Sequence, residues 1–108
     1  MSLLFKREFF DAIRSGAKTT TVRYWRPSHA GRFQVGQLLR PPFLDGRLRV
    51  EAVEPIRLTD LTDGDASADG FADLDVMLAR LRELYPELLS PAPPPGRRLF
   101  RIRFTYRR

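Results

Sequence analysis

Two stripes of apolar residues at three- and four-residue intervals predict the two main helices of the chain. The first helix covers residues 6–15 and stops at Gly16, a residue that suits the left-handed turn after a helix. Its stripe consists of Phe5, Phe9, Phe10 and Ile13. The second helix covers residues 73–84 and ends before Pro86. Its stripe consists of Leu74, Met77, Leu78, Leu81 and Leu84.

A strand is predicted over residues 19–24, directly after the first helix. The segment is rich in threonine, a β-branched residue that favours strands. Because successive side chains of a strand point to opposite faces, Thr19, Thr21 and Arg23 share one face. The other face carries Thr20, Val22 and Tyr24.

Three further strands are predicted later in the chain. A short strand near residues 38–39 follows Gly36, and the Asp45–Gly46 pair predicts a turn into a longer strand. In that strand, Leu48, Val50 and Ala52 alternate with charged residues, and Pro55 marks a strand end or a bulge. In the last strand, residues 98–106, apolar side chains alternate with outward arginines.

The order helix, strands, helix, strand favours an α+β fold, with helices packed on a small, largely antiparallel sheet. Residues 25–35 are predicted as a loop, residues 62–68 as a helical turn, and residues 90–96, with four prolines, as a stiff extended loop. A length of 108 residues without an internal repeat predicts a single domain over residues 1–108.

The composition limits the chemistry of the chain. Cysteine is absent and His29 is the one histidine, so we expect no disulfide, no metal site and no cofactor. No apolar run approaches the roughly 18 residues of a membrane span, and we expect a cytoplasmic protein without a membrane partner. The net charge of +6 favours a polyanion such as RNA, although an arginine-rich, thermally stable surface explains it equally well.

The run from Lys18 to Arg23 (KTTTVR) is the main chemical feature of the sequence. It places an amine, hydroxyls and a guanidinium directly after a predicted helix. The chain has 19 basic residues, and only Lys6 and Lys18 are lysines. A buried lysine can lose its proton and act as a base or nucleophile, whereas arginine stays charged. A lysine at a helix end also interacts favourably with the helix dipole, so the spacing leaves both interpretations open.

The pattern Lys18-Thr19-x-Thr21-x-Arg23 resembles the signature of the ASCH domain, a small PUA-like fold linked to RNA and modified nucleosides. Other segments match in the same order over nearly the whole chain. They are the glycine turn of residues 33–38, Leu61-Thr62, Asp69-Gly70-Phe71, Tyr85-Pro86 and the final strand of residues 99–104. The resemblance implies a PUA-like pseudobarrel flanked by two main helices, with a cleft.

One branch of this family is an amidohydrolase that removes the acetyl group from N4-acetylcytidine. It uses a lysine, a threonine three residues later and a glutamate before the second long helix, and these correspond to Lys18, Thr21 and Asp69. Lys18 would then activate the hydroxyl of Thr21, and Asp69 would orient the lysine or protonate the leaving amine. Aspartate replaces the family's glutamate here, and its carboxyl group reaches about 1.5 Å less far. An ordinary turn residue before Gly70 is the alternative for Asp69.

Three residues are candidates for binding the substrate or RNA. Thr19 and Arg23 share the predicted strand face of Thr21, and Trp25 follows in the sequence. A guanidinium such as that of Arg23 suits a carbonyl, a phosphate or an oxyanion, and an indole suits stacking on a base.

Three interpretations of function remain open. The first is a hydrolase acting on an N4-acylated cytidine, which requires Thr21 and Lys18. The second is an RNA-binding module without catalysis, in which Lys18 and Arg23 hold phosphates and the affinity falls with salt. The third is a regulatory domain that uses the proline-rich residues 91–95 as a contact surface. The expected partner is a modified nucleoside or RNA, and both a monomer and a weak dimer fit the sequence.

Overall fold

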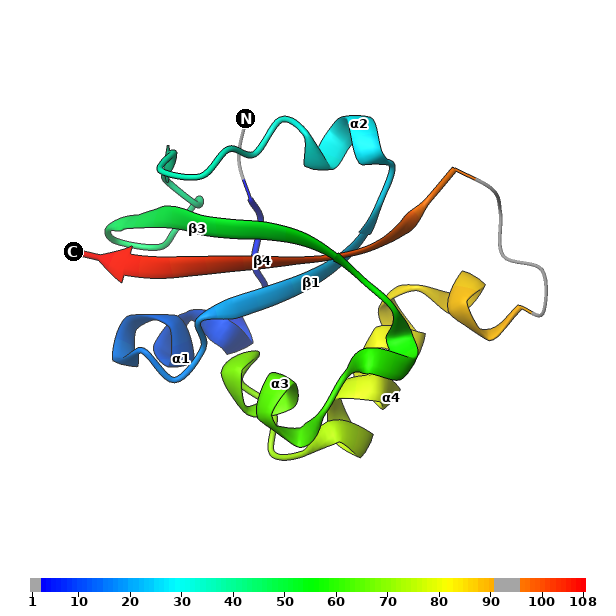
Figure 1. Cartoon of the computed structure of the whole chain (residues 1–108). Coiled ribbons are helices and arrows are strands. Elements are labelled where there is room, and N and C mark those ends of the chain that lie inside the picture. Colours follow the sequence, from blue (N-terminus) through cyan, green and yellow to red (C-terminus); the bar gives the residue numbers. More distant parts are fainter. Residues whose placement is uncertain (1–2, 91–95) are drawn as a thin grey trace.

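A curled four-stranded sheet forms the centre of the molecule, with strand order β1-β4-β3-β2 and antiparallel pairing throughout (Figure 1). The computed structural model describes residues 3–90 and 96–108. The strands are β1 (Thr20–Trp25), β2 (Leu38–Leu39), β3 (Arg47–Ile56) and β4 (Arg98–Arg107). β1 lies at one edge of this sheet, so one side of it is open to form a site.

Short helices surround the sheet and confirm the predicted α+β class. The α-helices are α1 (Phe10–Ser15), α2 (Pro27–Ala30), α3 (Asp63–Ala68) and α4 (Leu74–Leu84). The 3₁₀ helices are η1 (Arg7–Phe9), η2 (Leu58–Asp60) and η3 (Pro86–Leu89). Among the helices that the structure describes, none is long and apolar enough to cross a membrane.

The two predicted main helices are confirmed, with differences at their ends. The first begins as the 3₁₀ helix η1 and becomes α-helical at Phe10, and Gly16 ends it with a φ of 84°. The predicted loop of residues 25–35 contains the short helix α2. Pro27 starts this helix, since its fixed φ suits the first helical position. The proline-rich residues 91–95 lie outside the described residues.

β3 differs from its prediction in the position of its irregularity. The strand runs through Pro55 to Ile56, and its bulge lies between Val50 and Ala52. A bulge adds one residue to a strand and therefore reverses the faces of the residues that follow. Val53 consequently packs against the core in the place that the alternation predicted for Ala52.

The sheet separates two apolar clusters. The cluster on the side of α1 contains Leu3, Phe10, Ile13, Phe33, Leu39, Leu44, Leu48, Val50, Ile102 and Phe104. The cluster on the side of α3 and α4 contains Val22, Tyr24, Leu61, Ala66, Met77, Leu81 and Leu99. β4 supplies Ile102 and Phe104, on the face predicted to point inward, to the first cluster and Leu99 to the second. Leu84, expected in the core, is 40% exposed because it lies at the rim of the cavity described below.

Gly46 provides the first test of this architecture, since it has both an unusual backbone angle and close neighbours. Its φ is 124°, and a Cβ atom there would lie 2.6 Å from the carbonyl oxygen of Arg107. Gly36 also has a positive φ, 88°, but a Cβ atom would meet open space. We expect Gly46→Ala to lower the free energy of unfolding by about 2 kcal/mol or more, and Gly36→Ala by about 1 kcal/mol. Equal losses in urea denaturation would contradict the close packing of this turn.

Candidate functional site

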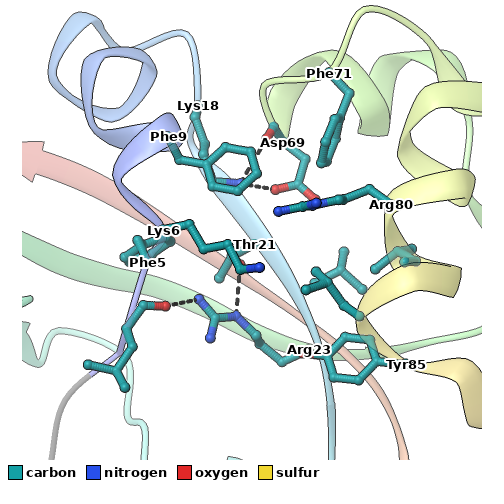
Figure 2. Close-up of a pocket in the computed structure, with 14 residues that line it drawn as sticks. Phe5, Lys6, Phe9, Lys18, Thr21, Arg23, Asp69, Phe71, Arg80 and Tyr85 are labelled. Atoms are coloured by element: carbon teal, nitrogen blue, oxygen red, sulfur yellow. Dashed lines mark hydrogen bonds and ion pairs between the residues drawn. The ribbon is translucent and has the colours of Figure 1, made fainter.

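A cavity of about 270 Å³ opens beside the edge strand β1, between the N-terminal segment and α4 (Figure 2). Four segments far apart in the sequence form its wall. The lining residues are Leu4, Phe5, Lys6, Phe9, Lys18, Thr21, Val22, Arg23, Asp69, Phe71, Arg80, Leu81, Leu84 and Tyr85. The cavity therefore brings together Lys18, Thr21, Asp69 and Arg23, four of the residues singled out in the sequence.

Lys18 is buried at this cavity, with 3% of its surface exposed. Its backbone N–H donates to the carbonyl oxygen of Ala12, as expected at a helix end. Its side chain turns inward, and Nζ donates to the carbonyl oxygens of Thr20 and Asp69, each at 2.8 Å, and to the carboxylate of Asp69. All three N–H groups of the ammonium thus have partners, and the lysine is an interior group rather than a solvated helix-end cation.

Asp69 ends α3 and is also 3% exposed. The glycine that follows allows this close approach to Lys18. Gly70 has a φ of 91°, and a Cβ atom there would lie 3.4 Å from Cβ of Lys18. The backbone of residues 69–70 therefore packs directly against the lysine, so the shorter aspartate reaches Nζ.

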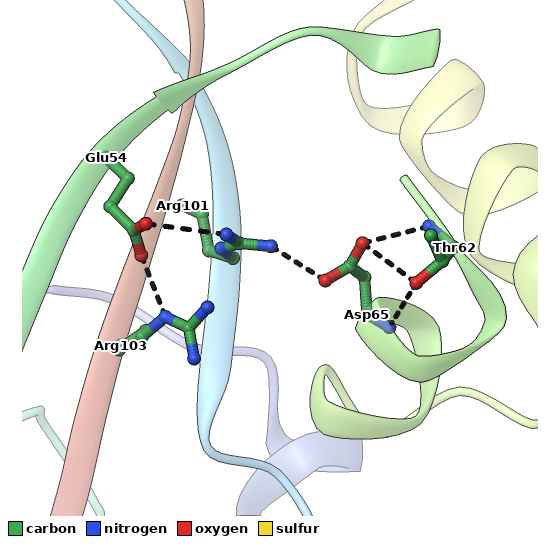
Figure 3. A network of polar contacts seen from close by, with 5 residues as sticks. All are labelled: Glu54, Thr62, Asp65, Arg101 and Arg103. Carbon is green, nitrogen blue, oxygen red and sulfur yellow. Dashed lines mark hydrogen bonds and ion pairs between the residues drawn. The ribbon is translucent and has the colours of Figure 1, made fainter. Parts of the chain in front are cut away.

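A polar network holds α3, and with it Asp69, against the sheet (Figure 3). Thr62 and Asp65 form a capping box at the start of the helix. The other carboxylate oxygen of Asp65 accepts a hydrogen bond of 2.7 Å from Arg101 Nη1 on β4. Arg101 also pairs with Glu54 of β3 at 3.5 Å. This outward arginine of the last strand thus links the sheet to the helix that carries the acid.

The pKa values of the Lys18–Asp69 pair are shifted toward the neutral forms of both groups. Burial raises the pKa of Asp69 to about 6, although the charge of Lys18 opposes the shift. Burial likewise lowers the pKa of Lys18, against the attraction of Asp69. Two aromatic rings help to exclude water from the amine of Lys18. Its Nζ lies 4.8 Å from the ring centre of Phe9 and 6.0 Å from that of Phe71. Burial thus brings the pKa values of the acid and the amine closer together than those of free side chains.

Arg23 and Thr21 form the second polar pair of the cavity. Nε of Arg23 donates to Oγ1 of Thr21 at 3.0 Å, and Nη2 donates to the carbonyl oxygen of Leu4. The guanidinium carbon lies 5.2 Å from the ring centre of Phe5. Burial lowers the pKa of Arg23. Among the described residues no carboxylate forms an ion pair with this arginine, which leaves it available to an oxygen of a ligand.

Thr19 and Trp25 lie elsewhere. Thr19 is exposed, and its backbone binds the carbonyl oxygen of Ala68 and the N–H of Phe104. Trp25 stacks on Phe33, with ring centres 5.1 Å apart, and lines a separate hollow. The structure thus gathers four of the six candidate residues at the cavity, and places Trp25 at the hollow and Thr19 at neither.

Sequence analysis missed three residues that line the cavity beside the pair. Phe9 belongs to the stripe expected in the core, and Phe71 is the last residue of the Asp69-Gly70-Phe71 motif, in which it was given no role at the site. Arg80 lines the cavity from α4, where Nη2 binds Glu8 at 2.6 Å. No spacing in the sequence distinguishes this arginine. In residues 3–90 and 96–108, no three His, Asp or Glu side chains gather as they would around a metal ion.

Comparison with known proteins identifies the fold. No protein-family model and no curated protein matches the sequence. The solved structure of hypothetical protein PH0355 matches with a TM-score of 0.72 and 12% identity, over 96% of this chain and 95% of that one. EF3133 from Enterococcus faecalis V583, of family DUF984, matches with a TM-score of 0.67 and 19% identity, over 98% and 80%.

An ASCH domain from Lactobacillus crispatus JV V101 matches with a TM-score of 0.57 and 16% identity, over 89% of this chain and 68% of that one. The chain therefore has the fold of the ASCH domain, and the PUA-like pseudobarrel predicted from its motifs is confirmed. At these identities the likeness concerns the fold.

The burial of Asp69 predicts how stability depends on pH. Its pKa is about 6 in the folded chain and near 4 when unfolded, so between these values the folded state retains a proton that the unfolded chain has lost. This contribution is full below pH ~4 and is lost as the pH rises to ~6. We expect the free energy of unfolding of the wild type, minus that of Asp69→Asn, to fall over this window in chemical denaturation. The exposed Asp60→Asn is the matched control, and a difference that rises with pH would refute the assignment.

Proposed function

We propose that the cavity beside β1 binds a modified cytidine and hydrolyses its N4-amide. The joint presence of Lys18, Asp69, Thr21 and Arg23 at one small cavity carries this proposal. It is supported by the ASCH fold and by the sequence resemblance to the N4-acetylcytidine amidohydrolases. The cavity volume of about 270 Å³ is near the lower end of ligand pockets, roughly 300–1,000 Å³, and suits one nucleoside.

The walls of the cavity suit a flat, partly polar ligand. Four aromatic side chains line it: Phe5, Phe9, Phe71 and Tyr85. Phe9 and Phe71 meet edge to face, with ring centres 5.8 Å apart, directly above the buried amine. A pyrimidine would contact these rings while its acylated amine points toward the polar floor.

Arg23 is placed to bind the oxygen on which negative charge develops. A guanidinium has five N–H donors, and the contacts with Thr21 and Leu4 account for two of them. The remaining donors can reach the carbonyl oxygen of an acyl group and stabilise the oxyanion formed when that carbon is attacked. The same contacts orient the carbonyl next to the hydroxyl of Thr21.

Thr21 is the nucleophile of the proposed reaction. Its Oγ1 accepts a hydrogen bond from Arg23, so its own proton is free to be donated. Lys18 in its neutral form accepts that proton once Asp69 holds the lysine's proton, which the raised pKa of Asp69 favours. Oγ1 then bonds to the acyl carbon and the C–N4 bond breaks. N4 leaves with the proton from Lys18, and water hydrolyses the acyl-threonine, regenerating the hydroxyl and releasing the carboxylic acid.

The experiment is the hydrolysis of N4-acetylcytidine, followed as free cytidine by chromatography. We expect turnover by the wild type and retention of measurable activity in Thr21→Ser, which keeps the hydroxyl. Thr21→Val should lower kcat by on the order of a thousandfold or more, and Lys18→Met by about a hundredfold or more. Thr105→Val, on the exposed face of β4, is the matched control and should behave as the wild type.

No turnover by a folded wild-type protein at high concentration would reject the hydrolase. The remaining functions would then be RNA binding or regulation without catalysis. Turnover that persists in Thr21→Val would reject Thr21 as the nucleophile and point instead to direct attack by water.

A further inference from the structure

A second hollow, of about 260 Å³, lies where β1 ends and α2 begins. Three arginines line it, Arg26, Arg32 and Arg97, and we call it the arginine hollow. Its other lining residues are Tyr24, Trp25, Ser28 and His29. None of the residues on which the proposed hydrolysis depends belongs to this set.

The backbone explains why these arginines meet. Arg26 precedes α2, and its carbonyl oxygen accepts hydrogen bonds from the N–H groups of His29 and Ala30. The chain turns again at the end of this helix, where the N–H of Arg32 binds the carbonyl oxygen of His29. Trp25 pairs with Arg98 in the β1–β4 register, which brings Arg97 opposite Arg26. The hollow is therefore a product of the fold where the end of β1, the start of α2 and the start of β4 meet.

The charges of the hollow are uncompensated. All three arginines are exposed, and no carboxylate lines the hollow. In the described part of the chain none of them forms an ion pair, whereas Arg14, Arg80, Arg101 and Arg103 all do. Cations that gather without a counter-ion repel one another and attract an anion. A guanidinium group matches the geometry of phosphate oxygens better than a lysine ammonium, which acts as a point charge.

Aromatic rings give the hollow a second kind of contact. The ring centre of Trp25 lies 4.4 Å from that of His29 and 5.1 Å from that of Phe33, so the indole is held in place. An indole and an imidazole beside arginines suit a ligand that combines phosphates with flat bases. A free anion would use only the arginines.

The hollow lies next to the cavity of Lys18. Tyr24 lines the hollow and Tyr85 lines the cavity, and their ring centres are 5.9 Å apart. Along β1, Arg23 of the cavity and Trp25 of the hollow are two residues apart, roughly 7 Å.

From these observations we infer that the arginine hollow binds the phosphates of a single-stranded nucleic acid. Arg26, Arg32 and Arg97 contact the phosphates, and the ring of Trp25 lies against the sugar or base. This site would hold a strand even if the cavity has no hydrolase activity.

The tryptophan in the hollow makes the test direct. Trp25 is the one tryptophan of the chain, so its fluorescence reports on this site. We expect a short oligouridylate to change the emission of Trp25 and to bind with an affinity that falls with salt. Arg26→Gln, Arg32→Gln and Arg97→Gln together should weaken binding at least roughly tenfold and reduce the slope of log affinity against log salt by about 2.

A variant with the same loss of charge separates a site from a general attraction. Arg47→Gln, Arg49→Gln and Arg107→Gln remove three exposed, unpaired arginines of β3 and β4 from the described part of the chain, and should weaken binding far less. Equal losses in the two triple variants would overturn the proposal, as would unchanged Trp25 emission. Inorganic phosphate or a phosphoserine peptide that binds as tightly as the oligouridylate would also overturn the assignment to nucleic acid. The triple variant of the hollow should hydrolyse N4-acetylcytidine like the wild type, since none of its three residues lines the cavity, which separates this test from that of the hydrolase.

Discussion

The buried pair of Lys18 and Asp69 is the constraint on which the site depends. Removing two charges from water costs several kcal/mol for each ion, and only good geometry and further hydrogen bonds offset that cost. Here the ammonium has three oxygen partners, two of them backbone carbonyls from β1 and the end of α3. Three separate elements must therefore be in register: the end of α1, the start of β1 and the end of α3. The capping box of α3, its link to Arg101 and the glycine at position 70 serve this register.

Polar chemistry is distributed along the edge strand in a definite order. The pair at Lys18 is suited to proton transfer. The next hydroxyl and guanidinium, at Thr21 and Arg23, are suited to bond making and charge stabilisation. The arginine hollow beyond Trp25 is suited to phosphates. Edge position matters because one side of β1 is free of a neighbouring strand. The N-terminal segment, with Phe5 and Phe9, covers part of that side and converts an open edge into a cavity.

Sequence reasoning succeeded where one local pattern determines the outcome. The stripe of α4 and the alternation of β4 follow directly from burial on one face, and both were predicted. The contact between Lys18 and Asp69 spans 51 positions, and only the resemblance to a family indicated it. The short helix at Pro27 and the bulge after Val50 escaped prediction because tertiary packing, not a run of residues, fixes them. Trp25 was grouped with Thr21, but its stacking on Phe33 places it at the other site.

The most direct test of this account is the titration of the Asp69 carboxyl carbon by NMR. We expect a midpoint near 6, because burial outweighs the attraction of Lys18, and a higher midpoint in Lys18→Met, which lacks that attraction. An aspartate in a short unstructured peptide provides the reference, with a midpoint near 4. A midpoint for Asp69 at or below that of the reference would show that the pair is a solvated or fully ionised salt bridge. The proton transfer on which the proposed chemistry rests would then lose its physical basis.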